Sequence, residues 1–259
     1  MKKIAAIPTL CTLAGGVCGF MAINVAARIP LDQPTPEQLR GLSTAGWLIF
    51  AAMAFDGLDG YLARMAKSTS EFGAQLDSLC DTISFGVAPA FVFSRLCIGQ
   101  YEHRMLLVAV LFVVCVILRL ARFNVETGNK LSDHLQFSGL PSPAAAGTIA
   151  SFAILLYGAG SEKNIPVFET GFEMILPFIG IGLALLMVSR IPYPHLINDV
   201  LHGHHRFQHI VKLVFAVTML FFAPRLFLPI LFSFFTASSL LRYGWEAVVL
   251  RRPREEPLF

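Results

Sequence analysis

Long apolar stretches, separated by short polar connections, run through the whole sequence. A helix that crosses a membrane needs about 20 mainly apolar residues, and most of the stretches approach this length. The pattern therefore predicts an all-α, polytopic integral membrane protein, a helical bundle of about eight transmembrane helices. The expected spans are Ile7–Ile29, Ala45–Ala66, Phe72–Phe93, Met105–Leu120, Pro143–Tyr157, Phe172–Val188, Ile210–Phe222 and Leu226–Leu241.

Composition supports this interpretation and excludes several other classes of protein. Hydrophobic residues make up 55% of the 259 residues and charged residues only 14%, whereas soluble domains carry about 25% charged residues. The same figures exclude intrinsic disorder. A net charge of +3, scattered along the chain, gives no reason to expect nucleic acid as a partner. Eight spans leave little chain over, so residues 1–259 are expected to form one membrane-embedded domain.

The distribution of basic residues predicts how the chain is oriented. Loops on the cytoplasmic side of a membrane are enriched in Lys and Arg. With eight spans both termini lie on the same side, and that side carries most of the 20 Lys and Arg residues. We therefore expect a multi-pass protein of the cytoplasmic membrane with both termini in the cytoplasm. The connections after Ala66, Leu120 and Val188 are expected on that side too.

Four aspartates interrupt the apolar pattern of the second and third expected spans. Asp56 and Asp59 are three residues apart, and Asp77 and Asp81 are four apart, so each pair shares one face of its helix. An ionised carboxylate at the centre of a membrane helix costs about 2.5–3.5 kcal/mol, so four of them need compensation. The polar stretch Arg64–Ser70 predicts a short turn that brings the two pairs together.

A divalent metal ion is the compensation that this cluster favours. Clustered carboxylates repel one another unless a cation neutralises them. Oxygen ligands with no His or Cys nearby favour Mg²⁺ or Mn²⁺ over zinc or copper. Such ions leave positions open for phosphate oxygens, which indicates a diphosphate-bearing substrate. Small residues on or beside the same helices leave room for a ligand to approach the backbone: Gly57, Gly60, Ala63 and Gly73.

Two other functions stay open on the residues alone. Intramembrane carboxylates also form cation or proton relays in transporters. Intramembrane prenyltransferases also use Asp-rich helices and Mg²⁺ to bind a diphosphate, but their first motif has a further Asp near position 63, where this chain has Ala63 and Arg64. A purely structural ion-pair network is disfavoured, because Arg64 alone cannot balance four acids.

The spacing of these residues matches a known signature, Asp56-x-x-Asp59-Gly60-x-x-Ala63-Arg64, eight residues, then Gly73-x-x-x-Asp77-x-x-x-Asp81. On these positions the chain resembles the CDP-alcohol phosphotransferase family. The resemblance implies that an alcohol displaces CMP from a CDP-linked donor at a metal site open to the cytoplasm. It also implies roles for single residues: the four aspartates Asp56, Asp59, Asp77 and Asp81 as metal ligands, Asp81 also as catalytic base, and Gly60, Ala63, Arg64 and Gly73 as lining of the CDP site.

Three further stretches resemble the bacterial and archaeal phosphatidylserine synthases within this family. They are Asp77-Ser78-Leu79-x-Asp81-x-x-Ser84-Phe85-Gly86-Val87-Ala88-Pro89, Arg119-Leu120-Ala121-Arg122-Phe123-Asn124 and Phe137-x-Gly139-Leu140-Pro141-x-Pro143-Ala144-Ala145-Ala146. This resemblance implies CDP-diacylglycerol as donor and L-serine as acceptor, with glycerol phosphate, inositol phosphate and choline as alternative acceptors. The first helix departs from the subfamily, which usually has Asn where this chain has Thr9 and Gly15.

The polar residues after the fourth expected span are candidates for binding the acceptor. Arg119, Arg122 and Asn124 end an apolar helix on the expected cytoplasmic side. A guanidinium pairs with a carboxylate or a phosphate, so these residues are candidates for acceptor or lipid-phosphate binding. The alternative is that the Arg side chains anchor the helix at the membrane interface, in contact with membrane lipids. The stretch Gly139–Pro143 predicts a turn into the fifth span. The sequence leaves open whether the chain forms a homodimer.

Overall fold

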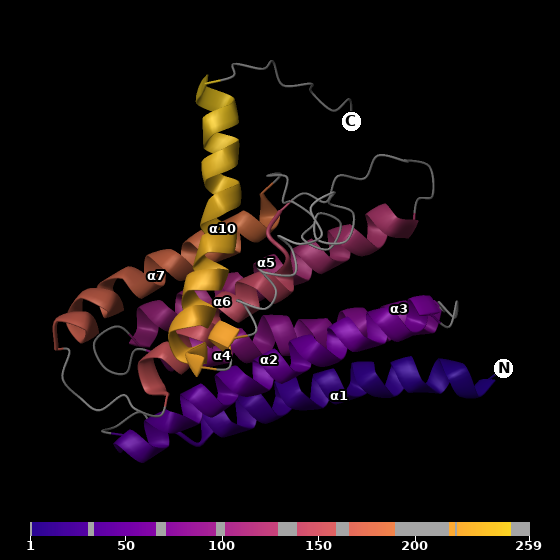
Figure 1. Cartoon of the computed structure of the whole chain (residues 1–259), viewed down its shortest axis with the longest axis horizontal. Coiled ribbons are helices and arrows are strands. Elements are labelled where there is room, and N and C mark those ends of the chain that lie inside the picture. The colour runs from indigo at the N-terminus through magenta and orange to yellow at the C-terminus, as the bar shows by residue number, and fades with distance from the viewer. Residues whose placement is uncertain are drawn as a thin grey trace.

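The computed structural model describes residues 2–30, 34–65, 71–96, 102–128, 139–158, 166–189, 218–220 and 222–249. The long elements in these ranges are all helices (Figure 1). They are α1 (Lys2–Ala27), α2 (Pro36–Met65), α3 (Glu71–Asp81), the π-helix η1 (Thr82–Val87), α4 (Ala88–Ser94), α5 (Glu102–Gly128), α6 (Ser142–Tyr157), α7 (Pro166–Val188) and α10 (Pro224–Val249).

These helices agree with the hydropathy pattern. Seven of the eight predicted spans correspond to helices, and the remaining one, Ile210–Phe222, lies largely outside the described residues. Four stretches are long and apolar enough to cross a membrane: Ala6–Ala27, Pro36–Met65, Glu71–Ser94 and His103–Val125. Three shorter apolar helices join them: Ser142–Tyr157, Met174–Val188 and Pro224–Ser238. The chain has the helical architecture of a multi-pass membrane protein.

α2 begins well before the predicted span because a capping box starts it. The backbone N–H of Thr35 donates to Gln38 Oε1 at 2.8 Å, and the N–H of Gln38 donates to Thr35 Oγ1 at 3.3 Å. These two bonds satisfy N–H groups that the first turn of a helix leaves unpaired. Pro36 suits the first helical position, where no N–H is needed. The helix thus starts in polar sequence, ahead of its apolar part.

α5 extends beyond the fourth predicted span. The span ends at Leu120, whereas α5 continues to Gly128, so Arg119, Arg122 and Asn124 lie within the helix and one more turn follows Asn124. Apolarity marks where a chain leaves the membrane, but it does not mark where a helix stops. The first Gly or Pro after Leu120 is Gly128, and the residues between them are compatible with a helix.

The third span is one continuous helical stretch, but its middle departs from α geometry. The π-helix η1 follows Asp81 directly. A π segment changes which residues share a helix face, and such segments are frequent at functional sites. Ser84 is buried in η1, and its hydroxyl donates to the carbonyl oxygen of Gly15 on α1 at 2.9 Å. The sequence predicted the span, but not this change of geometry next to Asp81.

α6 occupies the centre of the bundle. Most of its residues are buried, and many of them are Ala, Ser or Gly. Small residues allow close helix contacts in membrane proteins. A Cβ atom on Gly46 of α2 would lie 2.7 Å from the carbonyl oxygen of Ala150. A Cβ atom on Gly147 would collide with the Phe232 ring of α10. These glycines therefore allow α2 and α10 to approach α6.

The predicted turn before α6 is confirmed. Gly139 has a φ of 94°, which L-residues with a side chain rarely adopt. A Cβ atom at this position would lie 2.5 Å from the carbonyl oxygen of Met187. The N–H of Leu140 donates to the carbonyl oxygen of Leu186 at 3.0 Å, so the turn is fixed to the end of α7.

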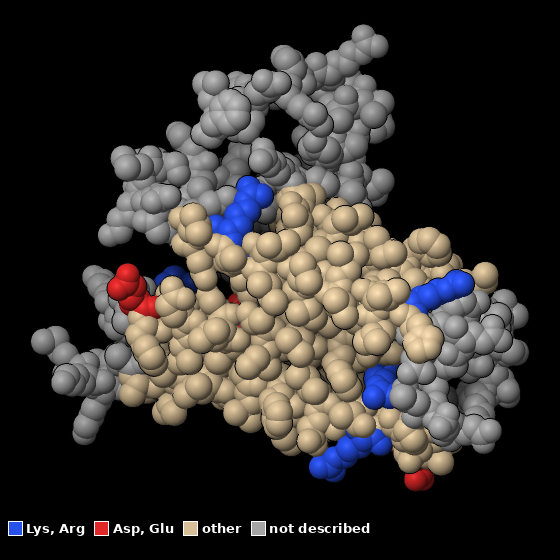
Figure 2. Space-filling view, turned by 180° about the vertical axis from the view of Figure 1, so that it is seen from behind, with Lys and Arg blue, Asp and Glu red and all other residues tan. Residues whose placement is uncertain are grey.

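The outer surface is suited to lipid. Large apolar side chains such as Leu107 and Phe178 are exposed on it. Charged side chains are few on the face in Figure 2, and most of its middle carries none. A continuous apolar surface of this kind marks a membrane contact. The N-terminus, the start of α3 and the end of α5 lie at the same end of the bundle, on the right in Figure 1.

Candidate metal centre between α2 and α3

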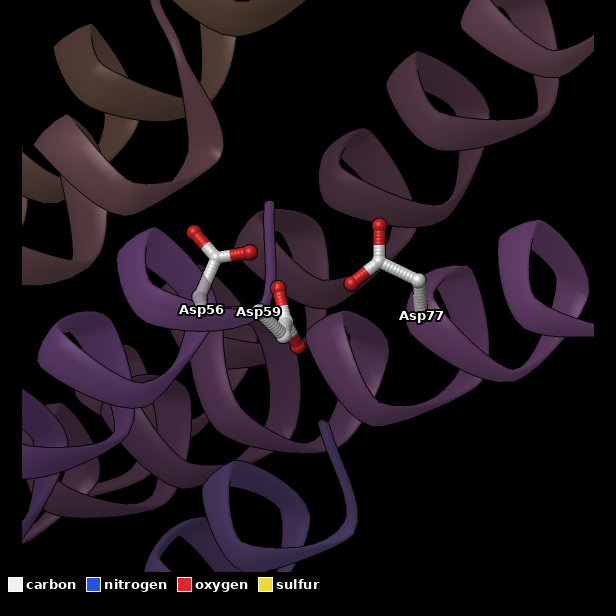
Figure 3. Close-up of side chains that lie close together, drawn as sticks. All are labelled: Asp56, Asp59 and Asp77. Atoms are coloured by element: carbon white, nitrogen blue, oxygen red, sulfur yellow. The ribbon is translucent and has the colours of Figure 1, made fainter. Parts of the chain in front are cut away.

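Three of the four predicted aspartates form a compact cluster. Asp56 and Asp59 come from α2 and Asp77 from α3, and one carboxylate oxygen of each lies within 4.8 Å of the other two. Figure 3 shows the three carboxyl groups at the junction of the neighbouring helices. The structure thus brings these three side chains together, as their spacing on two antiparallel helices predicted.

Asp59 is the buried member of the cluster. Its exposed fraction is 6%, whereas Asp56 and Asp77 are half-buried. Its Oδ2 atom has no hydrogen-bond partner among the residues that the structure describes. An unpaired buried polar group costs about 1–3 kcal/mol, and more if it is charged. Asp56 and Asp77 can supply the missing partner only when one of them is protonated, because an ionised carboxylate has no hydrogen to donate. A cation between the three groups can supply it when all three are ionised.

The chemistry of these side chains fits a hard divalent ion. The cluster offers carboxylate oxygens from three residues, and such oxygens are the ligands that Mg²⁺ and Mn²⁺ prefer. A few protein carboxylates leave further coordination positions for water or substrate phosphate. The cluster can therefore hold a divalent metal ion and keep part of its coordination sphere free.

Asp81 stands next to this cluster. It is the last residue of α3 and is half-buried. It does not belong to the compact group of three, but its charge interacts with each of them and with the guanidinium of Arg119. Its predicted roles as a fourth ligand and as a base both require a position beside the metal. The charge interactions indicate that Asp81 lies near the cluster, and both roles stay predictions.

The four residues predicted for the donor site lie on the same two helices. Gly60 follows Asp56 by one helical turn, Ala63 lies near the end of α2, and both are half-buried. The described atoms within 4 Å of a Cβ built on Gly60 belong to the Arg64 guanidinium, at 3.5 and 4.0 Å. The helix surface beside Gly60 therefore has room for a ligand. Arg64 is exposed, and Gly73 is half-buried in α3.

Arg119 is the candidate acceptor residue whose charge interacts with that of Asp81. Its Nη1 donates to the hydroxyl of Ser142 at 3.2 Å. Its Nε atom is buried and has no hydrogen-bond partner in the described part of the chain. α5 therefore carries a guanidinium with spare donor capacity next to Asp81. Ser142 lies in the predicted Gly139–Pro143 turn, and no sequence pattern indicated that its hydroxyl contacts Arg119.

The other two candidates are placed differently from Arg119. Arg122 is exposed on α5. Asn124 is half-buried, and its Nδ2 lies 3.0 Å from the hydroxyl oxygen of Ser78 on α3. Ser78 was part of the matched stretch Asp77–Pro89, but the sequence analysis assigned it no function. No local pattern could have paired it with a residue of α5.

α1 packs against α2, α3 and η1 next to the aspartate cluster. Thr12 is buried and lies beside the Asp59 carboxylate. A Cβ atom on Gly19 would lie 2.7 Å from the Cα of Ser84. The sequence analysis did not find these contacts. The repeated glycines of the first helix were the available signal, because small residues at helical spacing indicate close packing between membrane helices.

Comparisons with known proteins agree with this site. A family model described as CDP-alcohol phosphatidyltransferase matches residues 5–188, which include all four aspartates. A Helicobacter pylori protein named CDP-diacylglycerol–serine O-phosphatidyltransferase is 39% identical over 152 residues, 58% of this chain and 60% of its own length. The chain therefore spans about three fifths of that relative.

Two more relatives cover a larger share of this chain. The archaetidylserine synthase of Methanothermobacter thermautotrophicus is 36% identical over 200 residues, 74% of this chain and 72% of its own length. A Bacillus subtilis protein with the same name as the Helicobacter relative is 30% identical over 190 residues, 73% of this chain and 90% of its own length.

Proposed function

The chain belongs to the CDP-alcohol phosphatidyltransferase family, and we propose that it transfers the phosphatidyl group of CDP-diacylglycerol to the hydroxyl of L-serine. The products are phosphatidylserine and CMP. The observation that carries the proposal is the cluster of Asp56, Asp59 and Asp77 around an unpaired, buried carboxylate oxygen. The names of the relatives support serine as the acceptor.

We assign the metal ion, Mg²⁺ or Mn²⁺, to the four aspartates Asp56, Asp59, Asp77 and Asp81. When bound, such an ion neutralises the negative charge that develops on the diphosphate as CMP leaves. The carboxylates of α2 and α3 would hold the ion, and the bound ion would in turn orient the diphosphate. Asp59 would contribute a buried oxygen, and Asp56 and Asp77 would contribute half-buried ones.

The reaction needs one proton transfer besides the displacement. The serine hydroxyl oxygen forms a bond to the phosphorus that carries diacylglycerol, and the bond from this phosphorus to the CMP oxygen breaks. The carboxylate of Asp81 takes the hydroxyl proton, which raises the nucleophilicity of the oxygen. This role is supported by the surroundings of Asp81, because its charge interacts with the three clustered aspartates and with Arg119.

The remaining candidates divide between donor and acceptor. Gly60, Ala63, Arg64 and Gly73 are proposed to line the CDP site. Arg119 suits the carboxylate of serine or the phosphate of the lipid, because its Nε has no partner among the described residues and its charge interacts with that of Asp81. The exposed Arg122 suits a lipid phosphate. Asn124 is the weakest of the three as a substrate ligand, since its amide is already bonded to Ser78.

The membrane setting suits a lipid donor. We propose one membrane-embedded domain with eight crossings, in the cytoplasmic membrane, with both termini and the active site on the cytoplasmic side. The acyl chains then stay in the bilayer while the CDP head reaches the aspartates. A single cysteine placed near the N-terminus of a cysteine-free variant should react with a membrane-impermeant reagent only after cells are opened. Labelling in intact cells would contradict this orientation.

The activity is tested by measuring CMP release from CDP-diacylglycerol. Purified protein in detergent with Mn²⁺ is given serine, glycerol phosphate, inositol phosphate, choline or no acceptor. We expect stimulation by serine alone. Stimulation by another alcohol would keep the reaction class and refute serine. A folded protein that releases no CMP but moves ions across vesicle membranes would instead be a transporter.

A variant pair separates the aspartate chemistry from general damage to the protein. Asp81→Asn keeps the size of the side chain and removes its ability to take a proton, so it should abolish CMP release. Glu71→Gln changes an exposed carboxylate on the same helix and should leave the rate unchanged. If Asp81→Asn released CMP as fast as Glu71→Gln and the original chain, the role given to Asp81 would be refuted.

A further inference from the structure

Asn124 stands out because its side chain contacts the helix that carries Asp77. We propose that it is a positioning residue for the metal ligands: its amide holds Ser78, and Ser78 fixes the rotation of α3 and with it the direction of Asp77. The inference deepens the proposed function and rests on it. Ser78 directly follows Asp77 and precedes Asp81 by three residues, so its bond acts on the segment between two proposed ligands.

The hydrogen-bond geometry shows which group donates. Three contacts meet at the Ser78 hydroxyl oxygen: Asn124 Nδ2 at 3.0 Å, the Ala74 carbonyl oxygen at 3.1 Å and Asn124 Oδ1 at 3.2 Å. A hydroxyl has one hydrogen to donate and can accept as well. Donation to Ala74 and acceptance from Nδ2 use the two shorter contacts and satisfy both partners. Asn124 is therefore the donor between α5 and α3.

α3 depends on this contact because apolar packing holds it weakly. None of its 11 residues is buried, and its main neighbour among the described helices is α1. At its far end the bond from Ser84 to Gly15 fixes the π-helix that follows. On the side facing α5, the hydrogen bond between Asn124 and Ser78 connects the two helices. Helices with few buried contacts open and rotate most easily.

A small rotation of α3 is enough to disturb a metal site. Side chains reach roughly 5 Å from a helix axis, so a rotation of about 10° moves a carboxylate by about 1 Å. Metal–ligand distances tolerate only about 0.2 Å. Loss of the Asn124 bond should thus loosen the geometry of Asp77 relative to Asp56 and Asp59, which stand on the separate helix α2.

Direct Mn²⁺ binding is the measurement that isolates this role. Free Mn²⁺ is quantified by electron paramagnetic resonance in titrations of the purified protein, which requires no turnover. The variants are Ser78→Ala, Asn124→Leu and the double variant. Ala has the highest helix propensity, so Ser78→Ala should fold. The matched control is Thr82→Val, which removes a hydroxyl that donates from η1 to the Ser78 carbonyl oxygen and makes no contact with α5 that the structure shows.

We expect each single variant to weaken Mn²⁺ binding about fivefold, the equivalent of about 1 kcal/mol for one hydrogen bond. The double variant should be no weaker than either single variant, because both remove the same bond. Ser78→Thr keeps the hydroxyl and should bind Mn²⁺ like the original chain, as should Thr82→Val.

Other outcomes would overturn the inference. Unchanged Mn²⁺ binding in Ser78→Ala refutes it even if serine transfer is established. An increased KM for serine in Asn124→Leu, with normal Mn²⁺ binding, would make Asn124 an acceptor ligand instead. Weakened Mn²⁺ binding in a protein that releases no CMP would support the inference while refuting the proposed function.

Discussion

Replacing Asp59 by Asn should make the metal-free protein more stable and abolish its response to metal. In the metal-free state Asp59 is a buried carboxylate within 4.8 Å of the oxygens of Asp56 and Asp77. Its Oδ2 has no hydrogen-bond partner within the described ranges of the chain. Asn removes the charge at nearly constant volume, and its NH₂ group can donate to the neighbouring carboxylates. The same change removes a ligand from the proposed metal site.

The magnitude follows from the distance. Two like charges 4.8 Å apart repel by about 3 kcal/mol at an effective dielectric constant near 20. Relaxation of the protein and screening by solvent reduce this repulsion. We expect a gain of about 2 kcal/mol in EDTA, or a few degrees in Tm. Mn²⁺ at about 100 times its Kd should add about 2.7 kcal/mol to the original chain and little to the variant.

Thermal unfolding in detergent, with EDTA and with Mn²⁺, measures both effects. Glu37→Gln is the control, because it removes an exposed carboxylate from the same helix. The control should show the full Mn²⁺ shift of the original chain. The opposite result would be an Asp59→Asn variant that is less stable than the original chain in EDTA and gains as much stability from Mn²⁺. That result would refute the argument that Asp59 is a metal ligand held among like charges.

Two further predictions concern packing and charge. Gly19→Ala should unfold at a clearly lower temperature, because its Cβ would lie 2.7 Å from the Cα of Ser84. A Cβ atom on Gly57 would have no described atom within 4 Å, apart from its own helix backbone and chain neighbours. Gly57→Ala should therefore raise the free energy of unfolding by up to about 1 kcal/mol. Equal melting temperatures of Gly19→Ala and Gly57→Ala would contradict this contrast. Arg119→Met removes the cation that interacts with Asp81 and should lower kcat about tenfold to a hundredfold in the CMP assay. An unchanged kcat with an unchanged KM for serine would show that Arg119 only anchors its helix.

The features that the sequence predicted are those that depend on local periodicity. Membrane helices must satisfy their own backbone, so apolar length alone locates them. Three- and four-residue spacings put Asp56 with Asp59, and Asp77 with Asp81, on single helix faces. A short connection then made the meeting of α2 and α3 predictable. The turn at Gly139 was predictable for a similar reason, because Gly and Pro constrain the chain locally.

What could not be predicted depends on contacts between distant segments. Asn124 and Ser78 are 46 residues apart, and their bond exists only because α5 passes beside α3. The π-helix after Asp81 lies against the glycines of α1, which its own sequence does not show. The last turn of α5, from Asn124 to Gly128, was not predictable because hydropathy reports the membrane boundary and not the helix end.

The central claim is that the aspartate cluster transfers a phosphatidyl group to serine, and incorporation of labelled L-serine into lipid tests it most directly. Purified protein is incubated with CDP-diacylglycerol and Mn²⁺, and lipid-bound serine is measured together with CMP. We predict one CMP for each serine incorporated, and loss of both products in EDTA and in Asp59→Asn. Serine incorporation that persists in EDTA or in Asp59→Asn would contradict the account.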